Sequence, residues 1–218
     1  MDVIFANLDL WIPALGNTLL VFVGGGVIAL VLGLLVGAMR VSPVPIARGV
    51  GTVYVNIVRN TPLTLVFFFF VFGYPVLGLP QVSNTVLGIA AIGVYTATYV
   101  AETLRAGIST VPVGQAEAAR AIGLPFGKVM TLVVLPQAFR SVVPPMVSVL
   151  IALLKNTTVA AGFSIGELAA LRATINDARD RPGNPMEVLL WVAAVFVVLV
   201  LLLSWLQRTL ERRWRIVR

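Results

Sequence analysis

The sequence contains no cysteine and no histidine. Without cysteine there are no disulfide bonds and no thiolate chemistry, and without either residue the imidazole bases and the common zinc sites are excluded. Charged residues are scarce too, at 11% of the 218 residues, whereas soluble domains carry roughly 25%. Hydrophobic residues account for 59% and the mean hydropathy is +0.98, so we expect an integral membrane protein.

A nucleotide-binding P-loop is also missing from the sequence. That motif reads G-x-x-x-x-G-K-[ST]. The nearest stretch, GLPFGK from Gly123 to Lys128, is one residue too short and is followed by Val129. The chain is therefore not expected to bind ATP by this route, and any ATP-driven activity needs a partner that supplies the ATPase.

Long apolar runs dominate what is present. A helix needs about 20 mostly apolar residues to cross the hydrocarbon core. Five segments qualify: 12–39, 50–77, 85–104, 138–161 and 188–206. Backbone groups in lipid must be paired within the segment, so all five are expected to be helices. The prediction is an all-α, polytopic membrane protein in which residues 1–218 form one transmembrane domain.

The basic residues are distributed unevenly among the connections. With the N-terminus outside and the C-terminus in the cytoplasm, 11 of the 16 Lys and Arg residues are cytoplasmic: Arg40, Arg48, Arg105, Arg120, Lys128, Arg140, Arg208, Arg212, Arg213, Arg215 and Arg218. The outer connections hold only Arg172, Arg179 and Arg181, beside Glu167, Asp177 and Asp180. Basic loops stay in the cytoplasm, so this orientation is predicted. The bases are scattered between apolar blocks, which argues against nucleic acid as a partner.

The cytoplasmic connection between the third and fourth segments has an unusual composition. Residues 115–122 contain four alanines and favour a short helix with a flat surface. Gly123 is a natural helix stop, and Leu124-Pro125 enforces it. A second helix is expected from Phe126 toward Pro136. Helix physics leaves two interpretations open: an ordinary hairpin between spans, or a surface on which another protein docks.

The residue spacing in this connection resembles the EAA loop of permease subunits from ABC-type importers. It reads Glu117-Ala118-Ala119, then Gly123 after three further residues, then Val133 where the family usually has Ile, then Leu135-Pro136. Other motifs resemble the polar amino acid branch of that family, and RNTPLTLV and KNTT look closest to glutamate permeases. The motifs are GNTL (16–19), RNTPL (59–63), ETLRAGI (102–108), GQAEAAR (114–120), LPQA (135–138) and LKNTT (154–158).

The resemblance implies the type I ABC importer permease fold and a set of partners. The loop at about 110–137 would dock on a cytoplasmic ATPase dimer through Gln115, Glu117, Ala118, Ala119, Arg120 and Gly123. A second permease subunit, a related one in glutamate systems, and an extracytoplasmic solute-binding protein would complete the assembly in a bacterial cell membrane. The chain itself would bind no cofactor, because ATP and Mg²⁺ would sit on the ATPase.

Polar residues inside the apolar segments are candidates for the substrate path. A charge at mid-bilayer costs roughly 2.5–3.5 kcal/mol and normally faces protein or water. The candidates are Asn60, Thr61 and Pro62 in the second segment, Glu102 in the third, and Lys155, Asn156 and Thr157 in the fourth. Pro62 removes a backbone donor, and broken helices with free backbone groups commonly bind zwitterions at membrane depth.

Each candidate has a structural alternative. Glu102 and Arg105 are three residues apart and can pair on one helix face. Arg59, just before the broken stretch, reaches either a binding site or the inner headgroups. Lys155 either pairs with Glu102 across helices or contacts a substrate carboxylate, and the amide and hydroxyl groups that follow it can join neighbouring helices.

Two further features allow more than one interpretation. Gly33 and Gly37 form a small-xxx-small pair, which serves either close helix packing or a hinge. The outer connection at 162–185 contains ELAALRATIND, which is either a short amphipathic helix over the outer mouth or a solvated connector.

Together, the residues and the resemblance favour a transporter subunit rather than an enzyme: the permease of an ATP-driven importer for a polar amino acid, with glutamate first. Glutamine, aspartate, arginine and histidine are the alternative substrates. An ATP-independent secondary transporter is disfavoured because five segments do not divide into equal inverted repeats. A membrane-embedded enzyme is disfavoured because no acidic pair lies at membrane depth.

Overall fold

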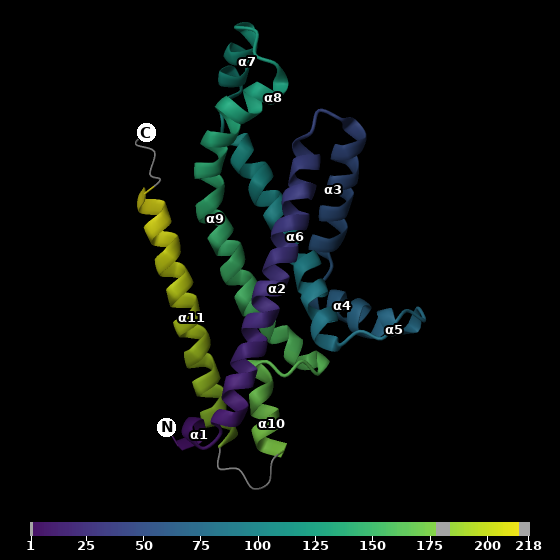
Figure 1. Ribbon diagram of the computed structural model, residues 1–218, viewed down its shortest axis with the longest axis vertical. Helices are drawn as coiled ribbons and strands as arrows, with labels where there is room; N and C mark the ends of the chain where they lie inside the picture. Colours follow the sequence, from purple (N-terminus) through teal and green to yellow (C-terminus); the bar gives the residue numbers. More distant parts are fainter. Residues whose placement is uncertain (1, 178–183, 214–218) are drawn as a thin grey trace.

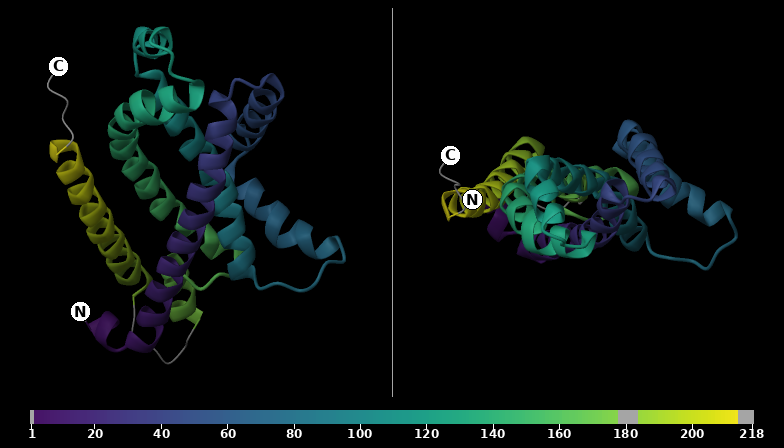
Figure 2. Two further views of the ribbon diagram at one scale, coloured as in Figure 1. Left: turned by 45° about the horizontal axis from the view of Figure 1, so that its top comes forward. Right: turned by 90° about the horizontal axis from the view of Figure 1, so that it is seen from above.

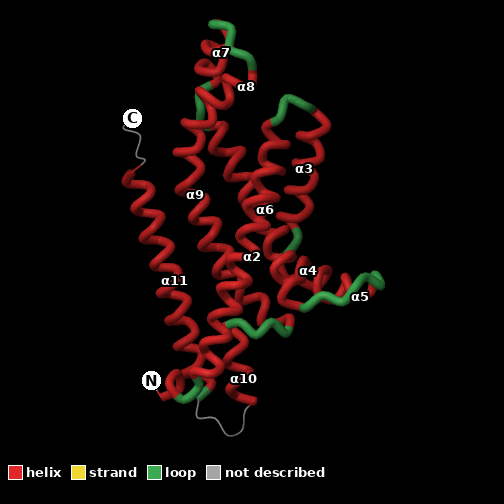
Figure 3. Tube along the Cα trace, in the orientation of Figure 1, coloured by secondary structure: helices red, strands yellow, loops and turns green. Residues whose placement is uncertain are grey.

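The computed structural model describes residues 2–177 and 184–213 of the chain. Within those ranges every regular element is a helix, and Figure 3 shows helices joined by loops, with no strand in the described residues. The all-α prediction is confirmed for this part of the chain. The charges counted at Arg179, Asp180, Arg181, Arg215 and Arg218 lie outside the described residues.

Two long helices run side by side through the centre of the molecule (Figure 1). They are α2 (Leu8–Val41), which follows the short α1 (Asp2–Phe5), and α6 (Asn84–Ser109). Ser83 caps α6, because its side chain accepts a hydrogen bond from the Val86 N–H. The two helices contain the predicted segments 12–39 and 85–104.

Glycines bring α2 and α6 into close contact. A Cβ added to Gly33 of α2 would lie 2.5 Å from Val100 Cβ, and one added to Gly93 of α6 would lie 2.7 Å from Ile28 Cβ. No side chain fits in so little space. Of the two interpretations of Gly33, the packing one is confirmed.

The second predicted segment, 50–77, is not a straight helix. Its elements are α3 (Pro45–Asn60), α4 (Leu63–Phe68), the π-helical turn η1 (Phe69–Gly73) and α5 (Tyr74–Val76). The chain bends by 102° between α3 and α4. Pro62 causes the bend, because it lacks an N–H and forces the preceding residue into an extended conformation. Among the described residues, four helices are long and apolar enough to span a membrane, and this bent pair is the fifth candidate.

The fourth predicted segment, 138–161, lies within a longer helical run. After α7 (Val113–Ala121) the chain turns into α8 (Phe126–Val129), the π-helical turn η2 (Met130–Val134), α9 (Leu135–Asn156) and the 3₁₀ helix η3 (Thr157–Phe163). The apolar run from Phe126 to Phe163 is one span candidate of 38 residues. The helix therefore begins before and ends after the predicted segment.

The outer connection and the last helix complete the bundle. The stretch ELAALRATIND forms η4 (Leu168–Ala170) and α10 (Leu171–Asp177), and α11 (Pro185–Arg213) contains the predicted segment 188–206. Leu171 and Ile175 are buried against Trp11 of α2 and Val188 of α11. The stretch ELAALRATIND is thus a packed amphipathic segment, and the solvated-connector interpretation is wrong for this part of the connection.

The two ends of the bundle carry different segments. In Figures 1 and 2, α7, α8, the α2–α3 connection and the C-terminal end of α11 lie at one end, here named the coupling end. Helices α1 and α10 lie at the opposite end. The segments that the charge count groups together in the cytoplasm therefore share one end. Which end faces the cytoplasm stays a prediction.

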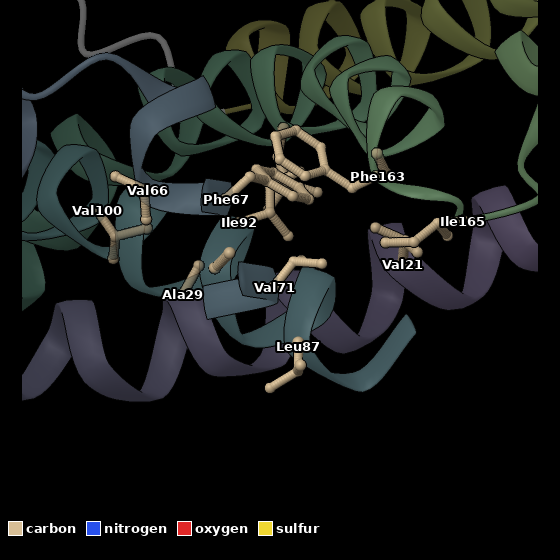
Figure 4. Close-up of a cluster of buried hydrophobic side chains, with 13 residues drawn as sticks. Val21, Ala29, Val66, Phe67, Val71, Leu87, Ile92, Val100, Phe163 and Ile165 are labelled. Carbon is tan, nitrogen blue, oxygen red and sulfur yellow. The ribbon is translucent and has the colours of Figure 1, made fainter. Parts of the chain in front are cut away.

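The main apolar core joins the broken segment to the central helices (Figure 4). Phe67 of α4 is fully buried and stacks on Phe163 of η3, with ring centroids 5.0 Å apart. Ile92 and Val100 of α6 and Val21 of α2 belong to the same cluster. This packing fixes the direction in which α4 leaves α3.

Candidate functional site

A polar cavity lies between α6 and α9. Its volume is about 410 Å³, within the range of about 300–1,000 Å³ that is common for small-molecule sites. The lining residues are Tyr95, Thr96 and Tyr99 from α6 and Ser148, Val149, Ala152, Leu153 and Asn156 from α9. The three from α6 occupy the middle of that helix, far from either end of the bundle.

The α6 wall of this cavity is made of two tyrosines and a threonine. The Tyr95 and Tyr99 hydroxyl oxygens lie 3.0 Å apart and share a hydrogen bond. Thr96 is buried, and its Oγ1 has no hydrogen-bond partner among the described residues. A buried hydroxyl without a partner is costly unless water or a ligand completes it. Because the Thr96 oxygen has almost no accessible surface, the polar groups that an occupant can reach on this wall are the two phenol hydroxyls.

The α9 wall adds two polar side chains at one helical face. Ser148, Ala152 and Asn156 are four residues apart, so they align along the helix. The small Ala152 leaves room between the two polar groups. Asn156 was predicted for the substrate path, whereas Ser148 and the α6 residues were not. The signal for the α6 residues was the stretch YTATY (95–99), which places two tyrosines four residues apart within an apolar segment.

Arg59 contacts Tyr99, one of the residues that line the cavity. Its guanidinium carbon is 5.1 Å from the centroid of the Tyr99 ring, a cation–π contact. α3 has 16 residues and begins at the coupling end, so Arg59 lies about 20 Å along the helix from that end. The Arg59 side chain is exposed, and the alternative in which it reaches the inner headgroups stays a prediction.

The break between α3 and α4 has few free backbone groups. The Thr61 hydroxyl donates to the Ile57 carbonyl at 2.8 Å, and the Asn60 amide donates to the Asn56 carbonyl at 2.7 Å. The Val58 carbonyl, which loses its usual donor to Pro62, accepts from the Thr61 N–H. These hydrogen bonds therefore satisfy the backbone carbonyls at the broken helix end. The roles of Asn60, Thr61 and Pro62 in substrate binding stay predictions.

Glu102 joins two helices near the coupling end. Its carboxylate forms ion pairs with Arg105 on its own helix and with Arg40 on α2. The alternative in which Glu102 pairs with Arg105 is confirmed. Glu102 is not among the residues that line the cavity between α6 and α9.

Lys155 and Thr157 face away from that cavity. Lys155 borders a second, mostly apolar cavity of about 550 Å³ between α9 and α11, together with Thr158. Glu102 takes other partners, so the alternative in which Lys155 pairs with Glu102 is wrong for the described residues. Thr157 is buried, and its hydroxyl donates to the Leu154 carbonyl. Lys155 and Asn156 are consecutive residues of one helix, so their side chains point in different directions.

The predicted hairpin at the coupling end forms a compact unit. α7 ends at Ala121, and Gly123, two residues later, has a φ of 88°, in the left-handed region that favours glycine. The N–H of Leu124 donates to the Ala119 carbonyl at 3.1 Å and closes the helix end. The Gln137 amide donates to the Gln115 side chain, which ties α7 to the start of α9.

The alanines of α7 face two directions. Ala119 is buried against Val129 and Val134 in the hairpin's own core. Glu117, Ala118, Arg120 and Gly123 are exposed, as is Gln115. The exposed set includes both charges and forms the outer face of the hairpin. Docking of an ATPase on this face stays a prediction.

A polar junction at the opposite end was not foreseen from the sequence. The Asn17 amide donates to the Gly166 carbonyl at 2.9 Å, and the Leu168 N–H donates to the Thr18 hydroxyl at 3.0 Å. Glu167 is fully buried between them and accepts from the Ala169 N–H at 2.9 Å. The GNTL and GEL stretches thus bind each other across 149 residues of chain.

Burial sets the protonation of Glu167. Removal from water raises the pKa of this carboxyl to about 7, against the lowering effect of the Ala169 N–H and the Thr18 hydroxyl. No group of three or more His, Cys, Asp or Glu side chains is placed to hold a metal ion in the described ranges.

Known proteins resemble this chain over nearly its full length. A family model described as "Binding-protein-dependent transport system inner membrane component" matches residues 29–216. The glutamate transport system permease protein GluC of Corynebacterium glutamicum is 42% identical over 205 residues, covering 88% of this chain and 87% of that protein. The probable glutamine ABC transporter permease protein GlnM of Bacillus subtilis is 33% identical over 221 residues, covering 98% and 99%.

Solved structures share the fold. The crystal structure of an amino acid ABC transporter with histidines matches with a TM-score of 0.87 at 28% identity, covering 95% of each chain. An inward-facing structure of the MetNI methionine ABC transporter matches with a TM-score of 0.76 and covers 96% of this chain and 98% of that one. At 21% identity, the second match shows the fold alone.

Proposed function

The chain belongs to the family of binding-protein-dependent transport system inner membrane components, and on that premise we propose that it carries glutamate through the cavity between α6 and α9. It is the permease subunit of an amino acid ABC importer with the type I permease fold, a multi-pass cell membrane protein and not an enzyme. An ATPase and a binding protein are its partners by family.

The observation that carries the proposal is the polar lining of a cavity inside an apolar bundle. Hydroxyl and amide groups at mid-helix are rare among lipid-spanning segments unless they serve packing or a path. Here five of the eight lining residues carry a hydroxyl or amide group, and the space is large enough for a small molecule. Both properties fit transient binding of a zwitterion.

The assembly follows from the family and the hairpin at the coupling end. We place the exposed face of α7 against a cytoplasmic ATPase dimer, which holds ATP and Mg²⁺, and the α10 end toward the extracytoplasmic binding protein. A related permease subunit completes the path as a heterodimer. ATP-driven closure of the ATPases would move the hairpins and rock the helices between inward-open and outward-open states.

Glutamate is favoured among the polar amino acids because a glutamate permease has 42% identity with this chain. Permeases named for glutamine and arginine are similar at 33% and 31% identity, so these substrates are the alternatives. The path runs beside Asn156 and past Asn60, Thr61 and Pro62. Glu102, Lys155 and Thr157 take structural roles or border the second cavity.

Uptake measurements test the cavity. Ala152→Leu fills the space between Ser148 and Asn156 and should lower glutamate uptake at least about 10-fold in cells whose only copy is the variant, because displaced polar contacts weaken binding. Ala193→Leu makes the same change in the second cavity, which Ala193 of α11 lines. Loss of uptake in Ala193→Leu but not in Ala152→Leu would move the path to the second cavity. Competition by unlabelled amino acids identifies the substrate.

Coupling is tested at the hairpin. Gly123→Val strains a residue with φ of 88°, and Glu117→Lys reverses an exposed charge on α7. Both should abolish uptake while the subunit still inserts and remains detectable in the membrane. Lys128→Glu reverses a charge on α8 and serves as the control. Normal uptake in both α7 variants contradicts the docking role.

A further inference from the structure

Arg59 is an exposed cation in the last turn of α3, inside an apolar bundle, and no described carboxylate neutralises it. Among the described residues, its guanidinium contacts the Tyr99 ring and forms no ion pair. The other arginine at a helix contact within the bundle, Arg40, is paired with Glu102. A charge in such a position is costly unless an anion meets it.

The cavity beside Arg59 contains no acidic side chain. All its polar lining groups, two phenols, two aliphatic hydroxyls and one amide, are neutral. Arg59 brings a formal positive charge to this wall through its contact with the Tyr99 ring. The resulting field favours an anionic group in the cavity over a cationic one.

The contact with Tyr99 leaves the guanidinium able to bind. A cation–π contact uses the charge of the guanidinium and not its N–H groups, of which arginine has five. These donors form a fork that matches the two oxygens of a carboxylate. No hydrogen bond from these donors to a described residue competes with such a ligand.

We propose that Arg59 binds a carboxylate of the transported amino acid through two of its guanidinium N–H groups. This inference rests on the proposed function, since it takes the cavity between α6 and α9 as the substrate site. Tyr99 holds the guanidinium at the rim, and the hydroxyl and amide groups of the wall accept the remaining polar groups of the substrate.

Glutamate offers two carboxylates, on the α-carbon and on the side chain. Glutamine keeps only the α-carboxylate, and 4-aminobutyrate keeps only the carboxylate of the side chain. Competition with these two compounds tells the two sources apart.

The test is equilibrium binding of radiolabelled glutamate to the purified complex of both permeases and the ATPase, in nanodiscs and without the binding protein. Omitting the binding protein removes its contribution to selectivity. Arg59→Gln should weaken glutamate binding about 30-fold, because the charge and both donors of the guanidinium fork are lost. Arg59→Lys keeps the charge but loses the fork and should weaken binding about 5-fold.

Arg48→Gln is the matched control. Arg48 lies on the same helix, where it donates to the Ser42 and Pro43 carbonyls at the coupling end. It should leave glutamate binding unchanged. An equal loss of glutamate and glutamine binding in Arg59→Gln assigns the α-carboxylate, and a loss for glutamate and 4-aminobutyrate alone assigns the side-chain carboxylate.

Unchanged glutamate binding in Arg59→Gln overturns the proposal, as does unchanged binding in Arg59→Lys if the first variant does not assemble. The cavity is tested separately in the same assay by Ala152→Leu. Binding lost in Ala152→Leu but kept in Arg59→Gln leaves the proposed function standing without Arg59. Binding kept in both variants overturns the proposed site and the role of Arg59 together.

Discussion

Helix α2 is held at its two ends by different kinds of interaction. Near the coupling end, Arg40 forms an ion pair with Glu102, and Arg105 pairs with the same carboxylate. At the opposite end, Asn17 and Thr18 exchange hydrogen bonds with residues 166–168, beside the buried Glu167. We call these the ionic junction and the hydrogen-bonded junction.

The difference follows from solvent access. The ionic junction is partly open to solvent, with 26% of the Glu102 side chain exposed, so water can partly solvate its charges. At the hydrogen-bonded junction Glu167 has no exposure, and no described cation pairs with it. A dry acid without a cation favours its neutral form. Two junctions on one helix should therefore differ in their response to mutation and to pH.

Loss of the ionic junction should have the largest effect. Glu102→Ala leaves Arg40 with an unpaired charge between helices, and we expect a loss of about 3–4 kcal/mol in unfolding free energy. The thermal unfolding midpoint of the purified complex measures it. Arg105→Gln removes the more exposed partner, 39% exposed, and should cost far less.

A double replacement sharpens this result. Arg40→Met with Glu102→Leu exchanges both partners for apolar groups and should recover most of the stability, because no charge is left unpaired. Equal losses in the single and double variants would show that the ion pair is not what fastens this end.

The second largest expected difference between the two junctions is their response to pH. The folded-state pKa of Glu167, about 7, lies above its ordinary value of 4.5, so folding takes up a proton between these values. The stability from this group is fully present below about pH 4.5, falls as the pH rises to about 7, and is constant above that. We expect a change of about 2–3 kcal/mol over this window.

Unfolding midpoints measured from pH 4.5 to 8 test this response. Glu167→Gln cannot titrate, so its midpoint should lose the wild-type slope. A slope that persists in Glu167→Gln would assign the pH response to other groups, among them Asp9, which lines a small cavity of about 220 Å³ together with Glu167.

Thr18→Val should have a smaller effect at the hydrogen-bonded junction. The change leaves the buried Leu168 N–H without its acceptor, at a cost of about 1–2 kcal/mol. Thr174→Val is the matched control, because that exposed hydroxyl donates only to a carbonyl one turn earlier in its own region. Equal midpoints for the two variants would contradict a specific role of Thr18.

Asn17→Ala should have the smallest effect. Its hydrogen bond to the Gly166 carbonyl is open to solvent, so water can replace the amide, and we expect a loss of about 0.5–1 kcal/mol. Asn60→Ala, whose side chain bonds to the Asn56 carbonyl, is the control. A loss as large as that of Thr18→Val would show that the junction is fastened mainly by Asn17.

Hydropathy was sufficient to predict most of the fold. Apolar runs placed α2, α6, α9 and α11, because lipid demands a continuous helix of fixed length. It was not sufficient at 50–77, where Pro62 turned one apolar run into two helices. The sequence contained the proline, but the 102° bend depends on Phe67 packing against Phe163, a contact between distant segments.

The site was predicted less completely than the fold. Asn156 was predicted because an amide is unusual in an apolar segment. Lys155 was predicted for the same reason, as a charge is more unusual still, but it faces another cavity. Its direction depends on how α9 is rotated against α6 and α11, which local sequence does not determine. Tyr95 and Tyr99 were missed because tyrosine is common in membrane helices and its role depends on what faces it.

The close packing of α2 and α6 has a mechanical consequence. Ile92 and Val100 of α6 sit over Gly25 and Gly33 of α2, where a Cβ would come within 2.5 Å of them. Neither helix can slide along the other unless these side chains leave their positions over the glycines, so the two helices should move as one rigid unit. Relative motion during a transport cycle should then leave the contact between α2 and α6 intact.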